Sequence, residues 1–369
     1  PAAAERRRWP GTLLVGLALA AWAGLLLWRQ ARTLGGDSLY AHLPFLGGQA
    51  LAGVLVLAGW LPWHLLCRRL WRLAPGHSLA LYLAAGVLTL LALAWSPAMA
   101  AGFAVLLLVT VGMAGTGRLL LALGHPFPLP AWAGLLCLLA LFHHLLLLLG
   151  LAGEFTPAAV GAVAAAAALP GAFRLVHGIR KKEYSLSPLR ALTPAQCLLV
   201  LALALVLAAA FVASSLPQSY MDATVNYLPW IEDLVEGGEL PGHFDNFYRL
   251  SFLAVPLLVA PAHLFLGEPG TGWATWLFLL LLGAMVHDAV YRLSGSRTAA
   301  LGAAFLALAV PPLWVFGTTP YMDIPLAAFT LGALLLLYRA LDEGSPALLA
   351  WAGALAGFAF SLKLNGVLF

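Results

Sequence analysis

Long apolar segments separated by short polar connections recur along the whole chain. Each has about 18 residues or more, which lets a helix cross a hydrocarbon core about 30 Å thick. The pattern predicts roughly eleven spans, at residues 11–28, 45–66, 78–95, 101–123, 130–151, 157–175, 196–214, 271–291, 299–317, 323–340 and 347–366. Short alternating segments typical of a membrane β-barrel do not occur. We therefore expect an all-α, polytopic transmembrane helical bundle.

Composition agrees with this class. Apolar residues make up 62% of the chain and charged residues only 9%, whereas soluble globular domains have about 25% charged residues. The first span follows three arginines, as in a signal peptide, but Trp28-Arg29-Gln30 provides no small-residue cleavage site. The sequence starts without Met and ends at Phe369 inside an apolar run, so we expect a fragment that continues beyond its C-terminus.

Residues 250–266 are apolar enough to suggest a twelfth span. Pro256 and Pro261 interrupt this segment, and a proline in a helix interior costs about 3 kcal/mol. A full span here would also move Arg292 and Arg297 outside and Asp323 inside. We therefore favour an interfacial or re-entrant segment that closes an outer loop.

Lys and Arg residues predict the orientation, because cytoplasmic loops carry an excess of them. Alternating spans place most of them on one side, which includes the loop of residues 174–190. The loop that follows residue 214 then faces outside, and it is rich in acidic residues: Asp222, Glu232, Asp233, Glu236, Glu239 and Asp245. The net charge of +4 thus reflects topology. No basic surface with interleaved aromatic residues indicates a nucleic-acid partner.

The chain divides near residue 192 in this interpretation. Residues 1–192 contain about six spans, short loops and few acids, which is typical of a transmembrane scaffold. Residues 193–369 contain the outer loop, residues 215–270, and most of the acidic residues. The sequence shows no clear internal repeat of the kind that would indicate an inverted-repeat transporter.

Several familiar kinds of site are not indicated. The three cysteines are Cys67, Cys137 and Cys197. They are isolated and show no CxxC spacing, so neither a zinc site nor a disulfide framework is predicted. Adjacent His143 and His144 point about 100° apart on a helix, which favours a polar contact between helices over a shared metal or proton site. Gly353 and Gly357 fit close helix packing. No Walker, GxSxG or HExxH motif occurs.

Two carboxylates stand out because they lie in similar local sequences at one membrane boundary. Tyr220-Met221-Asp222 follows the span that ends at residue 214, and Tyr321-Met322-Asp323 precedes the next-to-last span. Either acid has a simpler interpretation: Asp323 could cap a helix or complement its dipole, and Asp222 could be a solvated loop charge. Two acids on one face, each beside tyrosine and proline, together favour a functional site.

At this point residues 196–369 resemble the catalytic module of GT-C membrane glycosyltransferases, in particular protein O-mannosyltransferases and aminoarabinose transferases that modify lipid A. In that family an acid lies near the start of a large outer loop, an interfacial helix follows, and a second outward acid lies in a D-x-P-L-like context. Asp222, with Tyr227 nearby, and Asp323-Ile324-Pro325-Leu326 match those places. A later G-x-x-x-G-x-x-x-x-x-K pattern resembles Gly353, Gly357 and Lys363.

The sequence also departs from the family pattern. Protein O-mannosyltransferases usually have an Asp-Glu pair in the first loop, but Ala223 follows Asp222 here. Oligosaccharyltransferase relatives use a D-x-D-type metal site in the second loop, but Ile324 and Pro325 follow Asp323. A divalent metal is possible, yet no such site is seen, and six additional spans precede the module.

The resemblance implies transfer of a sugar from a polyprenyl-phosphate donor to a hydroxyl of a lipid, glycan or protein acceptor. The reaction would take place at the extracytoplasmic face of a bacterial-type inner or plasma membrane. Asp222 is the expected general base, since a carboxylate can accept the proton of an attacking hydroxyl. Lys363 would stabilise the leaving phosphate, unless it only extends to the lipid headgroups. Asp323 would orient donor hydroxyls or hold Lys363. Further substrate contacts are expected from Tyr220, Tyr227, Trp230, Asp245 and Tyr321, although such aromatic residues also form ordinary interfacial belts.

Two other function classes stay open. A secondary transporter or lipid-carrier flippase would explain many spans and a few membrane acids, but would place the acids at mid-bilayer rather than at one face. A non-catalytic membrane assembly subunit would tolerate replacement of both Asp222 and Asp323. We expect an inverting glycosyltransferase.

Overall fold

The structure is a computed structural model. It describes residues 60, 63–65, 67–69, 75–76, 78–79, 81–83, 97–123, 129–181, 191–215, 217–218, 223–241, 254–310, 313 and 316–362. Among these residues the regular elements are helices and no strand occurs.

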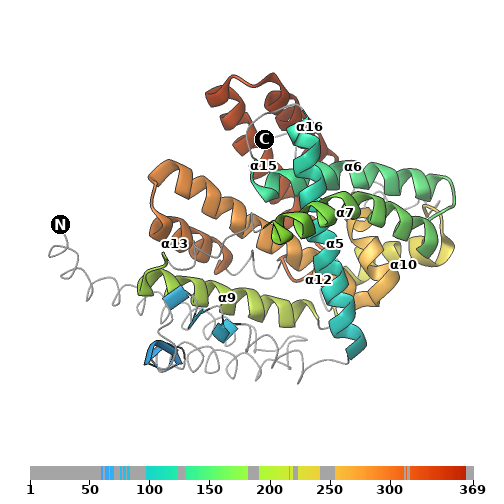
Figure 1. The fold of residues 1–369 in the computed structure, drawn as a ribbon. Helices are drawn as coiled ribbons and strands as arrows, with labels where there is room; N and C mark the ends of the chain where they lie inside the picture. The colour runs from blue at the N-terminus through green and yellow to red at the C-terminus, as the bar shows by residue number, and fades with distance from the viewer. Residues whose placement is uncertain are drawn as a thin grey trace. The chain divides into compact units, whose positions relative to one another are not determined.

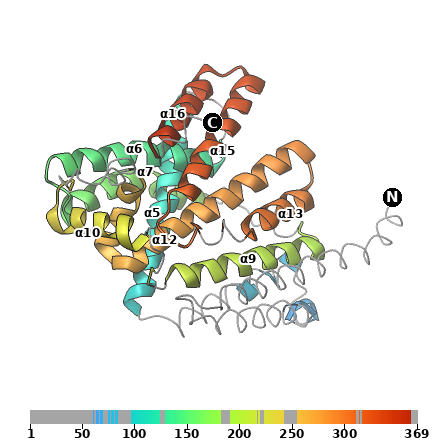
Figure 2. The same ribbon diagram turned by 180° about the vertical axis from the view of Figure 1, so that it is seen from behind.

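The helices follow one another along the chain as shown in Figure 1. Their bounds are α5 (Pro97–Ala122), α6 (Ala131–Leu151), α7 (Pro157–Arg180), α9 (Pro194–Ser214), the π-helix η1 (Ala223–Tyr227), α10 (Leu228–Gly237), α12 (Ala254–Ser294), α13 (Arg297–Leu308), α15 (Asp323–Glu343) and α16 (Pro346–Leu362). Helices α6 and α7 lie side by side in both views (Figures 1 and 2).

Six of the described helices are long and apolar enough to cross a membrane: α5 from Met99, α6, α7, α9, α12 and α15. Helices α13 and α16 are shorter apolar helices. The all-α polytopic architecture predicted from the sequence is confirmed, and the chain is an integral, multi-pass membrane protein. The predicted spans at 11–28, 45–66 and 78–95 lie largely or wholly outside the described residues.

One predicted span differs from its helix. The apolar pattern predicts residues 299–317, but α13 ends at Leu308, and the backbone N–H of Ala309 bonds to the carbonyl of Phe305. Pro311 and Pro312 follow directly in the sequence. Proline lacks an N–H and disfavours helical backbone in the residue before it, so this sequence ends a helix that hydropathy alone would extend.

The chain forms two compact units. Unit 1 consists of residues 1–95, 185–209 and 286–311, and unit 2 consists of residues 96–184, 210–285 and 312–369. These units differ from the predicted division near residue 192, because residues 96–184 belong to the same unit as most of the later helices. The predicted boundary at residue 192 stays a prediction about where the family-like module begins.

Unit 1 has a small apolar core built around Trp60, Leu79, Cys197 and Leu201, all 2% exposed or less. The side-chain amide of Gln196 donates to Thr298 Oγ1 at 3.2 Å, which joins the beginnings of α9 and α13. Cys197, like Cys67 and Cys137, is a buried free cysteine.

In unit 2, α5, α6 and α7 pack through small residues. Gly115 approaches Gly171 so closely that a Cβ on Gly115 would lie 2.8 Å from the Gly171 Cα. Gly171 follows Pro170 inside α7, and its N–H donates across the interface to Thr116 Oγ1 at 2.9 Å. Close approach of backbones through glycine is a common way to join helices in membranes, where burial of apolar surface supplies little driving force.

Helices α15 and α16 pack against each other and against α6. The rings of Phe329 and Phe358 lie 4.5 Å apart between centroids, and His143 meets Phe358 edge-on at 5.1 Å. Neither ring nitrogen of His143 has a hydrogen-bond partner in the described part of the chain, so its contact between helices is aromatic rather than the polar contact predicted. A Cβ on Gly353 or Gly357 would meet nothing within 4 Å, so the close packing predicted there is not seen among the described residues.

A sharp bend at Gly267 divides α12 into residues 254–266 and residues 268–294. Gly267 has φ 67° and ψ −158°, a conformation that only glycine adopts without strain. His263 Nδ1 and Thr271 Oγ1 share a hydrogen bond at 2.9 Å, although eight residues of a straight helix span about 12 Å. The chain therefore turns back on itself at Gly267, which separates the segment predicted to be interfacial from the span predicted at 271–291.

Candidate functional site

Two segments that are far apart in the sequence meet in unit 2: the segment that follows α9 and the segment that precedes α15. The side-chain amide of Gln218 donates to the Thr318 carbonyl at 3.3 Å. Directly before α10, the ring of Tyr227 meets Tyr321 edge-on, with 5.8 Å between centroids. Phe316 also contacts Tyr321, at 5.4 Å. These contacts hold Gln218 and Tyr227, from the segment after α9, beside Thr318 and Tyr321, from the segment before α15.

Helix α10 begins directly after this contact and is amphipathic. Its buried face consists of Leu228, Trp230, Ile231 and Leu234, a spacing that repeats with the turn of a helix. Glu232, Asp233 and Glu236 lie on the exposed face. The helix ends at Gly238, whose φ of 72° forms a left-handed cap and whose N–H bonds to the Leu234 carbonyl.

The turn between α6 and α7 holds the end of α10 in place. The N–H of Phe155 donates to the Gly238 carbonyl at 2.8 Å, and the N–H of Leu240 donates to the Gly150 carbonyl at 3.0 Å. Phe155 is 1% exposed, so its ring is fully packed beneath these bonds. The turn between α6 and α7 thus supports the end of α10 in the loop that follows α9.

A polar cluster forms where α12 bends. The carboxylate of Glu268 accepts a hydrogen bond from the backbone N–H of Gln218. The negative charges of Glu268 and of Glu232 on α10 both act on the half-buried His263. Because Gln218 also bonds to Thr318, it connects the segment after α9 with the α12 bend and with the segment before α15.

Asp323 lies in the first turn of α15 and is half-buried. An acid in the first turn complements the positive end of the helix dipole, an effect of about 0.3–1 kcal/mol. Thr318 and Thr319, which precede it, are 5% and 3% exposed. Asp323 therefore follows a packed segment, two residues after Tyr321 in the sequence.

Four predicted site residues are described by the structure, and they differ in exposure. Tyr227, Tyr321 and Asp323 are half-buried, and the first two are in direct contact. Trp230 is 3% exposed, so its ring packs inward from α10. The other predicted residues lie outside the described part of the chain: Tyr220, Asp222, Asp245 and Lys363.

Sequence reasoning missed Gln218, His263 and Glu268. A signal for Glu268 was present, because Gly267-Glu268-Pro269-Gly270 is a strong turn sequence inside an apolar segment. A charged residue within a turn at a membrane boundary is a candidate for a structural or functional contact. His263 offered no such signal, since its partner Thr271 becomes a neighbour only through the bend.

The described residues include no group of three or more His, Cys, Asp or Glu side chains arranged to hold a metal ion. The chemistry available at this place is that of carboxylates, one imidazole, amides and tyrosine rings. Such groups accept protons and bind hydroxyl-rich ligands.

Comparison with known families gives a match over the C-terminal part of the chain. Residues 257–369, under a third of the chain, match the family described as dolichyl-phosphate-mannose-protein mannosyltransferase. The match confirms the predicted resemblance to GT-C-type, mannosyltransferase-like enzymes over this part of the sequence. It supports a membrane glycosyltransferase that uses a polyprenyl-phosphate sugar donor. Searches among curated proteins and among solved structures gave no match.

Proposed function

We propose that this protein transfers a sugar from a polyprenyl-phosphate donor to an acceptor hydroxyl, with inversion, at the extracytoplasmic face of the membrane. The observation that carries the proposal is the edge-on contact of Tyr227 with Tyr321. Tyr227 follows Asp222 by five residues and Tyr321 precedes Asp323 by two residues in the sequence, which supports a shared site for the two carboxylates. The family match to residues 257–369 supports the same class of reaction.

In the proposed reaction, Asp222 accepts the proton of the acceptor hydroxyl while the hydroxyl oxygen attacks the anomeric carbon of the donor sugar. The bond between that carbon and the phosphate oxygen breaks, and the polyprenyl phosphate leaves with its electron pair. A carboxylate that removes the proton in this step contributes about 10²–10⁴-fold to the rate. Attack from the face opposite the phosphate inverts the configuration of the anomeric carbon.

Lys363 is proposed to stabilise the charge that develops on the leaving phosphate, which an ammonium group does as a point charge. Asp323 is proposed to orient hydroxyls of the donor sugar from the start of α15. Tyr220, Tyr227 and Tyr321 would provide aromatic contacts to sugars.

The proposal gives Asp245 a role in binding the acceptor and Trp230 a role in packing. Asp245 remains a candidate for binding acceptor hydroxyls from the outer loop. Trp230, at 3% exposure, is assigned to anchoring α10 rather than to stacking on a sugar, because a ring buried in packing presents no face to a ligand.

A direct test uses the purified protein in liposomes with polyprenyl-phosphate mannose labelled in the sugar. A glycosyltransferase releases polyprenyl phosphate and moves the label to an acceptor in an added membrane extract. A transporter or flippase moves the labelled donor across the bilayer and leaves the bond between sugar and phosphate intact. Movement of intact donor with no release of polyprenyl phosphate from any of several sugar donors would contradict the proposal.

A further inference from the structure

An apolar cavity of about 470 Å³ lies within unit 2, among α5, α6, α7 and both parts of α12. Its lining is apolar apart from Thr110, whose hydroxyl donates to the Leu106 carbonyl at 2.8 Å. The lining therefore offers no unpaired polar group to bind water. Apolar cavities of this kind stay dry and take up apolar ligands.

The cavity opens on the outer surface of these helices. Two of its lining residues, Val105 on α5 and Phe265 on α12, are 58% and 52% exposed. All four helices that form the walls are long and apolar enough to cross a membrane. Lipid chains are thus the molecules that reach the opening.

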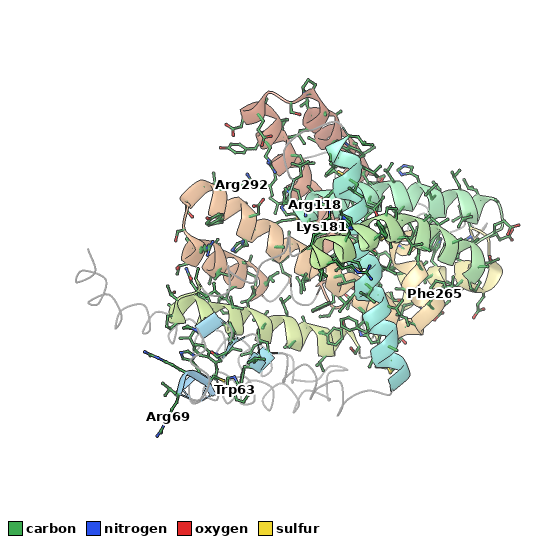
Figure 3. All side chains as sticks on the ribbon, viewed as in Figure 1. Trp63, Arg69, Arg118, Lys181, Phe265 and Arg292 are labelled. Carbon is green, nitrogen blue, oxygen red and sulfur yellow. The ribbon has the colours of Figure 1, made fainter. Side chains whose placement is uncertain are left out.

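The lining is long enough for one extended chain. Lining residues on α5 run from Gly102 to Met113, a distance of about 16 Å along a helix. The volume falls within the range of about 300–1,000 Å³ for ligand sites. The first part of α12 forms one wall and packs against the other helices. Leu266 packs on Gly102 of α5. Phe265 Cζ would lie 3.6 Å from a Cβ on Gly161 of α7. Figure 3 shows Phe265 beside α7.

The charges beside one end of this cavity are negative. Phe265 and Leu266 line the cavity and lead directly into Gly267 and Glu268. Glu268 and Glu232 both act on His263, which follows the lining residue Ala262. Among the described residues of 129–173 and 191–291 there is no Lys or Arg. A headgroup that carries an amine is attracted to such an end, whereas one that carries only negative charge is repelled.

We propose that the cavity binds one acyl chain of a zwitterionic phospholipid, with the headgroup amine beside Glu268 and Glu232. This lipid is distinct from the sugar donor, whose phosphate brings negative charge without an amine. Because α12 forms both a wall of the cavity and the bend that carries Glu268, the bound chain packs against the element that holds Gln218 in the candidate site.

The test is native mass spectrometry of the protein in mild detergent, after removal of lipid and addition of equal amounts of phosphatidylethanolamine and phosphatidylglycerol. We expect one retained phospholipid, with phosphatidylethanolamine favoured at least fivefold. The Glu268→Gln variant should bind total lipid with that preference reduced to about twofold or less.

A second variant fills the cavity. Ala165 lines it and its neighbour Ala166 does not, although both lie on the exposed side of α7. Ala165→Phe should reduce the retained lipid about tenfold, and Ala166→Phe, the matched control, should leave it unchanged. Circular dichroism and gel filtration should show that both variants keep the helical fold of the parent.

Three results would overturn the proposal. The first is a parent protein that retains no phospholipid or shows no preference between the two. The second is a folded Ala165→Phe variant that retains lipid as the parent does. The third is a retained molecule whose mass is that of an isoprenoid lipid, since the cavity would then hold the donor.

Discussion

Tyr321 and Tyr227 are the described residues that relate most directly to the proposed chemistry. Their edge-on contact joins two segments about a hundred positions apart in the sequence, and Asp323 follows two residues after Tyr321. An edge-on aromatic pair adds about 0.5–1.5 kcal/mol beyond area burial. The contact therefore helps to hold the segment before α15, which leads into Asp323, against the residue that directly precedes α10.

Lys363 provides the residue-level prediction for the donor phosphate. If its ammonium stabilises the leaving group, Lys363→Met should lower the rate of transfer about 10²-fold or more, as does loss of one oxyanion donor. Lys363→Arg should be partly tolerated, because the charge is kept. The measurement is kcat with a labelled polyprenyl-phosphate sugar, and a Lys363→Met enzyme with the parent's kcat would leave Lys363 with a headgroup contact only.

At the scale of elements, the bend in α12 depends on one glycine. Gly267→Ala should destabilise the protein by about 1–3 kcal/mol, because its φ of 67° with ψ of −158° is a strained combination for a residue with a Cβ. Thermal unfolding in detergent measures the loss.

The matched control for this variant is Gly302→Ala in α13. A Cβ on Gly302 meets nothing within 4 Å, and alanine is favoured over glycine in a helix by about 1 kcal/mol. Gly302→Ala should therefore be neutral or stabilising. If Gly267→Ala and Gly302→Ala changed the unfolding temperature equally, the bend would not depend on the backbone conformation of Gly267.

Sequence patterns predicted elements where a single strong signal decided the structure. The span predicted at 323–340 corresponds to α15, Asp323–Glu343, because a proline-containing turn precedes it and Gly344 ends it with a φ of 62°. The span predicted at 299–317 was too long, because hydropathy does not register that Pro311 and Pro312 end a helix. The bond between His263 and Thr271 depends on a backbone reversal, which periodicity does not encode.

The candidate site was predictable to a similar extent. Tyr321 and Asp323 were found because Tyr321-Met322-Asp323 repeats the earlier Tyr220-Met221-Asp222. The contact of Tyr321 with Tyr227 is a result of the fold. Trp230 was expected to be a sugar contact, since aromatic residues near a membrane boundary serve either role. Only packing places its ring inside the buried face of α10.

At the scale of the whole molecule, the proposed reaction requires one orientation of the chain in the membrane. The excess of Lys and Arg predicts that residues 174–190 are cytoplasmic and that α10 faces outside. Glu239→Cys should therefore react with an impermeant thiol reagent in intact cells, while Ser185→Cys should not. The three native cysteines are buried, which keeps background labelling low, and Glu239 is exposed with ordinary backbone, unlike Gly238.

The reverse labelling pattern would place the candidate site in the cytoplasm and would remove the extracytoplasmic reaction. Labelling of Ser185→Cys after the membrane is opened by detergent serves as the control that this position is accessible. The hydrogen bonds from the α6–α7 turn to Gly238 and Leu240 require that turn to lie on the same side as α10.

Sugar transfer by the Asp222→Asn variant shows directly whether Asp222 acts as the general base. The amide keeps the size of the side chain but cannot accept the proton, so transfer should fall about 10²–10⁴-fold, while expression and membrane insertion stay normal. Asp323→Asn should also impair transfer, mainly by raising KM if this carboxylate orients a substrate. Glu236→Gln, on the exposed face of α10, should keep the parent rate. Transfer by purified Asp222→Asn at the parent rate would contradict the proposed mechanism and would favour a transporter.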